Sequence, residues 1–207
     1  YLSVKSDADA EAVEEFKKTE VKVIEMKARP ENGFVLAEKS DLAGDMVFSE
    51  DSGNAVTDLS HLQTKDIHGK EFSSKDFANY DLTMVNVFAT WCTACIQEIP
   101  DLVEVQKEMQ AKGVNIIGIV TDTVDDTGEN QEAIEKAKLI QEKTKANYSF
   151  LMPDKTNFNG RLNGIQALPE TFFVDKNGQI VGETYSGSHN KKDWTAIIEK
   201  ELSALKK

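Results

Sequence analysis

The chain of 207 residues contains only two cysteines, Cys92 and Cys95, three positions apart. The apolar run 82–88 precedes them, and a sequence with helical spacing follows from residue 94. This order places Cys92 at an exposed helix N-terminus, where free backbone N–H groups and the helix dipole stabilise a thiolate. Cys95 follows one turn later on the same face, close enough to form a disulfide. The pattern predicts thiol–disulfide exchange, with Cys92 as nucleophile and Cys95 as the resolving thiol.

Other uses of the cysteine pair fit the sequence less well. Two cysteines cannot build a disulfide scaffold, and so short a loop between them constrains the unfolded chain little. Zinc needs about two more ligands, whereas His61, His68 and His189 are scattered and form no Cys/His pattern with the pair. We therefore expect no metal and no cofactor.

The dipeptide between the cysteines indicates the direction of the reaction. Thr93-Ala94 carries neither a charge nor a histidine, so little beyond the helix end lowers the pKa of Cys92. We expect a reductant or a mild exchanger of disulfides, and not a strong oxidase with a heavily stabilised thiolate.

A glutamate follows the pair at helical spacing. Glu98 lies three positions after Cys95, so both side chains share a helix face that can turn toward the sheet. A semi-buried carboxylate there would have a raised pKa and could exchange protons with Cys95. The alternative is a solvated surface glutamate, which is the usual state of this residue on a helix.

Composition narrows the class of protein. Hydrophobic residues make up 40% of the chain and charged residues 29%, which is typical of a globular protein. The formal net charge of -12 argues against nucleic acid or anionic lipid as a partner. No stretch approaches the roughly 20 apolar residues of a membrane-spanning helix. The chain begins at Tyr1, and we expect a mature or trimmed form whose targeting region is missing.

Hydrophobic periodicity predicts the elements that position the pair. We expect strands at 82–88, 114–120 and 148–152, hairpins within 62–72 and 171–184, and helices at 94–112, 131–145 and 191–205. Alternating strands and helices imply parallel pairing, and the last hairpin adds antiparallel strands. The sequence thus predicts an α/β fold with a mixed central sheet and helices on both faces. We expect Trp194 in its core and residues 122–130 in a solvated acidic loop.

Residues 1–45 differ from the rest of the chain. They contain an acidic segment at 7–18 that favours a helix, a loosely alternating segment at 21–26 that favours a strand, and a turn signal at 29–33. We interpret residues 1–45 as an N-terminal extension or tether, and residues 46–207 as the main domain.

Several motifs in this order resemble the TlpA/ResA-like family of extracytoplasmic thiol–disulfide oxidoreductases, which have the thioredoxin fold. They are Asn86-Val87-Phe88-Ala89-Thr90-Trp91-Cys92-x-x-Cys95, Glu98-Ile99-Pro100, Leu168-Pro169-Glu170-Thr171-Phe172 and Asp175-Lys176-Asn177-Gly178. The resemblance extends from about residue 58 to the C-terminus. The segment between residues 120 and 148 matches a central insertion of that family.

The resemblance assigns roles around the cysteines. The pattern Cys-x-x-Cys-x-x-Glu-x-Pro favours the semi-buried state of Glu98 over the solvated one. Cytoplasmic thioredoxins carry a buried aspartate at the position of Asn86, so the resemblance implies that Glu98 takes over proton handling. Trp91 is expected to be a partly exposed contact for the partner.

The resemblance also implies a substrate-binding bend. Thioredoxin-fold proteins place a cis-proline opposite the cysteines, which predicts a cis peptide bond between Leu168 and Pro169. This bend would let the Leu168 backbone pair with an extended substrate segment. Glu170 departs from the family pattern, in which a small hydroxyl residue is frequent, and it leaves the preferred charge of the substrate open.

Partners and location follow from the resemblance as well. It implies a membrane-tethered disulfide reductase outside the cytoplasm that acts on disulfide-containing proteins and receives electrons from a membrane thiol carrier. Recipients would include apocytochromes during cytochrome c maturation, or a secreted peroxide or methionine-sulfoxide repair enzyme. We expect a monomer. The alternatives are a peroxiredoxin-like peroxidase, whose Pro-x-x-x-Thr-x-x-Cys context is absent, and a non-catalytic thioredoxin-fold binding module.

Overall fold

The structure is a computed structural model that describes residues 25–28, 34–37 and 58–205. The chain divides into two units, Tyr1–Ser49 and Glu50–Lys207. In the first unit, β1 (Glu25–Ala28) pairs with β2 (Phe34–Ala37) as an antiparallel hairpin. The strand predicted at 21–26 overlaps only the start of β1. The helix predicted at 7–18 and the turn at 29–33 lie outside the described residues, and the boundary after residue 45 stays a prediction.

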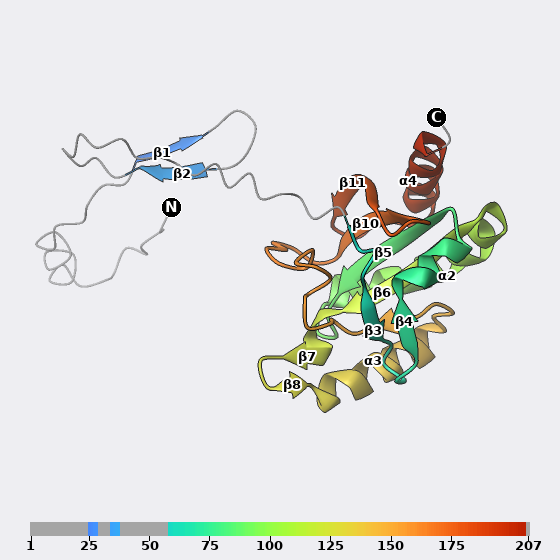
Figure 1. Ribbon diagram of the computed structural model, residues 1–207, viewed down its shortest axis with the longest axis horizontal. Helices are drawn as coiled ribbons and strands as arrows, with labels where there is room; N and C mark the ends of the chain where they lie inside the picture. The colour runs from blue at the N-terminus through green and yellow to red at the C-terminus, as the bar shows by residue number, and fades with distance from the viewer. Residues whose placement is uncertain (1–24, 29–33, 38–57, 206–207) are drawn as a thin grey trace, which may run out of the picture. The chain divides into compact units, whose positions relative to one another are not determined.

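The second unit is built around a five-stranded sheet in the order β11-β10-β5-β6-β9 (Figure 1). Its strands are β5 (Leu82–Phe88), β6 (Val114–Val120), β9 (Phe150–Leu151), β10 (Glu170–Asp175) and β11 (Ile180–Ser186). β5, β6 and β9 are parallel, whereas β10 runs antiparallel to β5 and to β11. The predicted mixed sheet is confirmed. Every residue of β5 is buried because elements cover both faces of this central strand.

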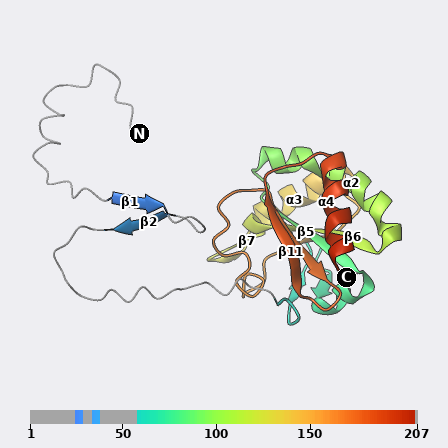
Figure 2. The same ribbon diagram turned by 90° about the horizontal axis from the view of Figure 1, so that it is seen from above.

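Three α-helices cover one face of the sheet, namely α2 (Thr93–Met109), α3 (Gln131–Thr144) and α4 (Lys191–Ala204). Their apolar side chains join one cluster with Met84, Ile116 and Phe173 from the strands. Figure 2 shows the three helices grouped together. Right-handed crossovers that advance in one direction, from β5 to β6 to β9, put their helices on the same face. All three α-helices therefore lie on one face, and the expected sheet flanked by helices is confirmed with a 3₁₀ helix at 74–79 on the other face.

Shorter elements cover the second face. They are β3 (Gln63–Lys65), β4 (Glu71–Ser73), the 3₁₀ helix η1 (Ser74–Asn79) and the irregular segment 153–168. β3 and β4 form the antiparallel hairpin that was predicted within 62–72. Phe77 and Phe158 pack here against Val85 and Val87, the side chains that alternate with those of the helix face.

The remaining elements are short. The 3₁₀ turn η2 (Gln110–Lys112) extends α2, and Gly113 ends it with a φ of 82°, a left-handed conformation that suits glycine. After β6, the 3₁₀ turn η3 (Thr121–Thr123) leads into a small hairpin of β7 (Val124–Asp125) and β8 (Gly128–Glu129). Within the described residues, no helix has the length and hydrophobicity needed to cross a bilayer.

Candidate active site

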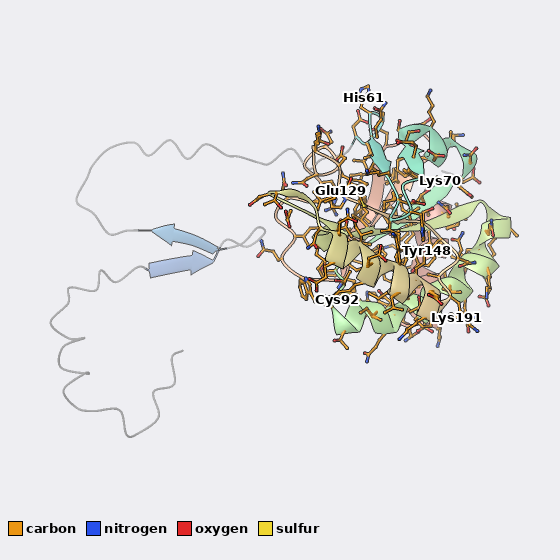
Figure 3. The ribbon with its side chains drawn as sticks, turned by 90° about the horizontal axis from the view of Figure 1, so that it is seen from below. His61, Lys70, Cys92, Glu129, Tyr148 and Lys191 are labelled. Carbon is orange, nitrogen blue, oxygen red and sulfur yellow. A yellow bond between two sulfur atoms is a disulfide. The ribbon has the colours of Figure 1, made fainter. Side chains whose placement is uncertain are left out.

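Cys92 and Cys95 form a disulfide at the junction of β5 and α2, with their Cα atoms 5.3 Å apart. Cys92 is the N-cap of α2, and its Sγ accepts a hydrogen bond of 3.3 Å from the backbone N–H of Cys95. Cys92 is 8% exposed and Cys95 only 1%. The predicted order of accessibility holds, but Cys92 is far more covered than the exposed terminus we expected. In Figure 3, the label of Cys92 lies beside the green ribbon of α2.

The side chain of Asp122 holds the chain segment that directly precedes the cysteines. The Thr90 backbone N–H donates to Asp122 Oδ1 at 3.0 Å, and the Thr90 hydroxyl donates to Asp122 Oδ2. Asp122 belongs to η3, so this contact joins the ends of the neighbouring strands β5 and β6. Our expectation of a wholly solvated acidic loop was wrong for Asp122, while Asp125 and Glu129 are exposed as predicted. No local pattern marks a contact across 32 residues.

Glu98 lies on the buried face of α2, with only 3% of its surface exposed. Its Oε1 accepts hydrogen bonds of 2.7 Å from the His189 backbone N–H and from Trp194 Nε1. Its Oε2 accepts one of 3.2 Å from Asn86 Nδ2. Burial raises the pKa of Glu98, and these donors offset the rise only in part. The predicted buried position and raised pKa are confirmed, whereas proton exchange with Cys95 stays a prediction.

The donors to Glu98 come from three different parts of the fold. Asn86 lies on β5, and its Nδ2 also donates to Thr171 Oγ1 on β10 at 3.1 Å. Trp194 is fully buried as predicted, but sequence reasoning missed its hydrogen bond to a residue 96 positions away. The role of His189 was missed for the same reason, since its backbone donates across 91 positions. Only the three-dimensional fold brings these groups together.

The bend before β10 has the predicted geometry. The Leu168–Pro169 peptide bond is cis, as expected. Pro169 is buried, and its carbonyl accepts a 2.9 Å hydrogen bond from the Gly187 backbone N–H. Leu168 is half-buried and packs against the cluster that includes both cysteines. Trp91, next to Cys92, is 71% exposed, which fits the predicted contact surface.

Glu170 is paired rather than open to a substrate. Its Oε1 accepts a 2.8 Å hydrogen bond from Arg161 Nη1, and the two side chains are 12% and 14% exposed. This ion pair was not foreseen from the sequence, and it pairs the charge of Glu170 within the protein. Among the described residues, no group of three or more His, Cys, Asp or Glu side chains could hold a metal ion.

Comparisons with known proteins match this chain to thiol–disulfide redox proteins. The AhpC/TSA family matches residues 53–182. The thiol:disulfide interchange protein DsbE of Haemophilus influenzae is 29% identical over 136 residues, which cover 66% of this chain and 67% of that protein. The thiol-disulfide oxidoreductase ResA of Bacillus thuringiensis is 26% identical over 65% of this chain and 71% of its own length. A thiol:disulfide interchange protein of the thioredoxin family from Chlorobium tepidum superposes with a TM-score of 0.57 and 29% identity, over 70% of this chain and 96% of that one.

Proposed function

We infer that this chain, which belongs to the AhpC/TSA family, is a thiol–disulfide oxidoreductase that reduces disulfides in partner proteins outside the cytoplasm. The predicted resemblance to ResA and the thioredoxin fold are confirmed by these relatives. The observation that carries the function is the Cys92–Cys95 disulfide at the N-terminus of α2. This site combines two sulfurs, a helix N-terminus and the buried carboxyl group of Glu98, which together suit reversible exchange.

The proposed cycle starts from the reduced pair. The Cys92 thiolate attacks one sulfur of the substrate disulfide, which forms a mixed disulfide and releases the other substrate sulfur as a thiolate. Cys95 then loses its proton and attacks Cys92 Sγ, which frees the second substrate sulfur and leaves the Cys92–Cys95 disulfide. Two electrons pass to the substrate, and its two thiolates take up protons from the solvent. A donor dithiol then returns the pair to the reduced state.

Glu98 is proposed as the base for the second step. It lies one turn beyond Cys95 on the buried side of α2, and burial raises its pKa, which favours a role in proton exchange. The carboxylate would accept the Cys95 proton, and the neutral acid would return it when the pair is reduced. Two neutral donors, Asn86 and Trp194, hold the carboxylate in place, and the His189 imidazole lowers its pKa electrostatically without offsetting the effect of burial.

Substrate recognition is proposed at the cis-proline. Within the described residues, no backbone hydrogen bond engages Leu168, so its peptide groups are available to an extended segment of the partner. Leu168 and Trp91 would flank that segment with apolar surface. Because this recognition uses main-chain atoms, it suits proteins of different sequence.

The cellular setting completes the proposal. We propose a membrane-tethered monomer that receives electrons from a membrane thiol carrier. Its substrates are disulfide-containing proteins, with apocytochrome cysteines during haem attachment as the first candidates. These details go beyond the names of the relatives and rest on the resemblance to ResA.

Insulin reduction tests the activity. Wild type with a dithiol donor should reduce insulin disulfides, and Cys92→Ser should fall to the rate of the donor alone, because no nucleophile remains. Equal rates for the two proteins would contradict the proposal and favour a binding module. A parallel assay of peroxide turnover without a partner reductase tests the peroxidase alternative, which predicts a Cys92-dependent loss of peroxide.

A further inference from the structure

We propose that Arg161 is a positioning residue for substrate binding, which holds the bend at Pro169 in place and cancels the charge of Glu170. This inference rests on the proposed function, because it concerns the strand that would pair with the substrate. The Arg161 clamp is defined here as Arg161 with its three contacts, Glu170, Phe172 and Thr184.

The contacts of Arg161 join the segment 153–168 to two strands. Nη1 donates to Glu170 Oε1 at 2.8 Å, and Nη2 donates to Thr184 Oγ1 of β11 at 3.2 Å. The guanidinium carbon lies 4.2 Å from the centroid of the buried Phe172 ring. A planar guanidinium can stack on a ring and donate from its edge at the same time, which a lysine cannot do. Because both charged side chains are largely buried, loss of one would leave the other without compensation.

An unusual backbone turn delivers Arg161 to this place. Asn157, Phe158 and Asn159 have φ values of 51°, 55° and 56°, and Gly160 follows with 85°. Asn and Gly enter the left-handed region readily, whereas a bulky residue such as Phe158 is strained there. Such a turn persists only where its surroundings determine it. The turn therefore indicates a position that the fold maintains against the local preference of the chain.

The surroundings of the turn are well defined. Asp154 Oδ1 accepts a 2.7 Å hydrogen bond from the Phe158 backbone N–H, and Thr156 Oγ1 accepts one of 2.9 Å from the Asn159 N–H. The Phe158 ring is fully buried in the core of the second face. The Arg161 N–H closes the turn by donating to the Phe158 carbonyl at 3.0 Å. The apolar anchor at Phe158 thus fixes the segment from which Arg161 reaches β10.

The clamp acts on the residue next to the cis-proline. Glu170 follows Pro169 directly, and the Pro169 carbonyl is held by Gly187 from the end of β11. The Glu170 backbone is paired with Ser186 of β11, and Arg161 adds a side-chain link from Glu170 to Thr184 of the same strand. A substrate segment then finds a preformed edge and loses less binding free energy to ordering of the loop. The same ion pair leaves no net charge beside the proposed pairing site.

Two charge variants and their combination test the clamp on disulfide-linked peptides that differ only in flanking lysine, serine or glutamate. Arg161→Met should raise KM for the serine peptide about tenfold, the change expected from losing roughly one charge-assisted hydrogen bond. It should also shift the preference toward the lysine peptide, because Glu170 is uncovered. Glu170→Gln should shift the preference toward the glutamate peptide. The double variant should lose both preferences and keep the raised KM.

Controls separate positioning from general damage. Lys155→Met removes an exposed cation from the same segment, and its KM values should match wild type. Arg161→Lys keeps the charge but loses the planar fork, so KM should rise without a change of charge preference. Unchanged KM and peptide order in Arg161→Met would overturn the inference. So would a loss of rate that is equal for the peptides and for hydroxyethyl disulfide, a small substrate without a backbone. If wild type reduces none of these disulfides, the proposed function fails instead.

Discussion

Glu170 and Thr171 are neighbours on β10, yet they serve opposite faces of the sheet. Thr171 points to the helix face, where its hydroxyl accepts a hydrogen bond from Asn86, which also donates to Glu98. Glu170 points to the second face, where it pairs with Arg161. One strand, entered through a cis-proline, therefore connects the proposed site for protons with the proposed site for substrate.

The carboxylates of Glu98 and Glu170 differ in what surrounds them. Glu98 is held by neutral donors, and its burial raises its pKa. Glu170 is held by a guanidinium in a nearly enclosed ion pair. A buried carboxylate that is not in an ion pair can exchange a proton, whereas one that is paired with a guanidinium serves as a fixed contact. Variants of the helix face should therefore change the pH dependence, and variants of the Arg161 clamp should change the substrate charge preference.

The largest effect is expected from Glu98→Gln. If Glu98 takes the proton of Cys95, the resolving step should slow about 100-fold, which is the lower range for a positioned acid–base group. Rapid-quench release of the second substrate thiol at several pH values measures this step. Glu104→Gln, an exposed change on the same helix, is the matched control. A resolving rate equal to wild type would remove Glu98 from the mechanism.

The same variant makes a prediction about stability. Burial raises the folded pKa of Glu98 above its ordinary value of 4.5, so the native state binds more protons than the unfolded chain between these two pKa values. The free energy of unfolding of wild type should therefore fall as pH rises through that interval. In Glu98→Gln this contribution is absent, and the profile should be flatter. Urea unfolding of both proteins in the oxidised state over this range measures the difference.

Trp194→Phe should have the next largest effect. It removes the Nε1–H donor to Glu98 and keeps most of the buried ring, which should cost about 1.5–3 kcal/mol of unfolding free energy at neutral pH. Trp91→Phe, at the exposed tryptophan, should leave the stability unchanged. Equal stability of the two variants would show that the donor does not support the carboxylate. Neither variant should change the order of the charged peptides.

Thr171→Val should have the smallest effect. It deletes the acceptor for Asn86 Nδ2, at a cost of about 1 kcal/mol. Thr171→Ser keeps a hydroxyl and should recover most of this loss, as measured by urea unfolding. A serine variant as unstable as the valine variant would assign the cost to packing instead. Because Thr171 faces away from Arg161, KM for the peptides should stay at the wild-type value.

Local pattern was enough to predict most of the fold. The apolar run 82–88, the stop at Gly113 and the turn at 175–178 each determine an element through residues that are close in sequence. The side of the sheet that each helix covers could not be read this way, because it depends on the strand order. The placement of β9 beside β6 put α3 on the same face as α2.

The candidate site likewise contains residues that local sequence predicted and residues that only the fold revealed. Cys92 is the N-cap of α2, and Cys95 and Glu98 lie in its first two turns, so their spacing in sequence was enough to predict that they lie close together. Trp194, Arg161 and Asp122 reach the site across long separations in sequence, and each would pass for an ordinary core or surface residue. The left-handed turn that carries Arg161 has asparagine at positions 157 and 159 and glycine at 160, which is only a weak local signal and does not show what Arg161 contacts.

The reaction of Cys95→Ala with a disulfide-linked peptide tests the central claim most directly. The reduced variant retains the nucleophile but cannot resolve the intermediate, so it should stall as a covalent adduct. Mass spectrometry of the adduct should locate the peptide on Cys92, and dithiothreitol should release it. Complete absence of the adduct, under conditions in which wild type is oxidised by the same peptide, would contradict the account.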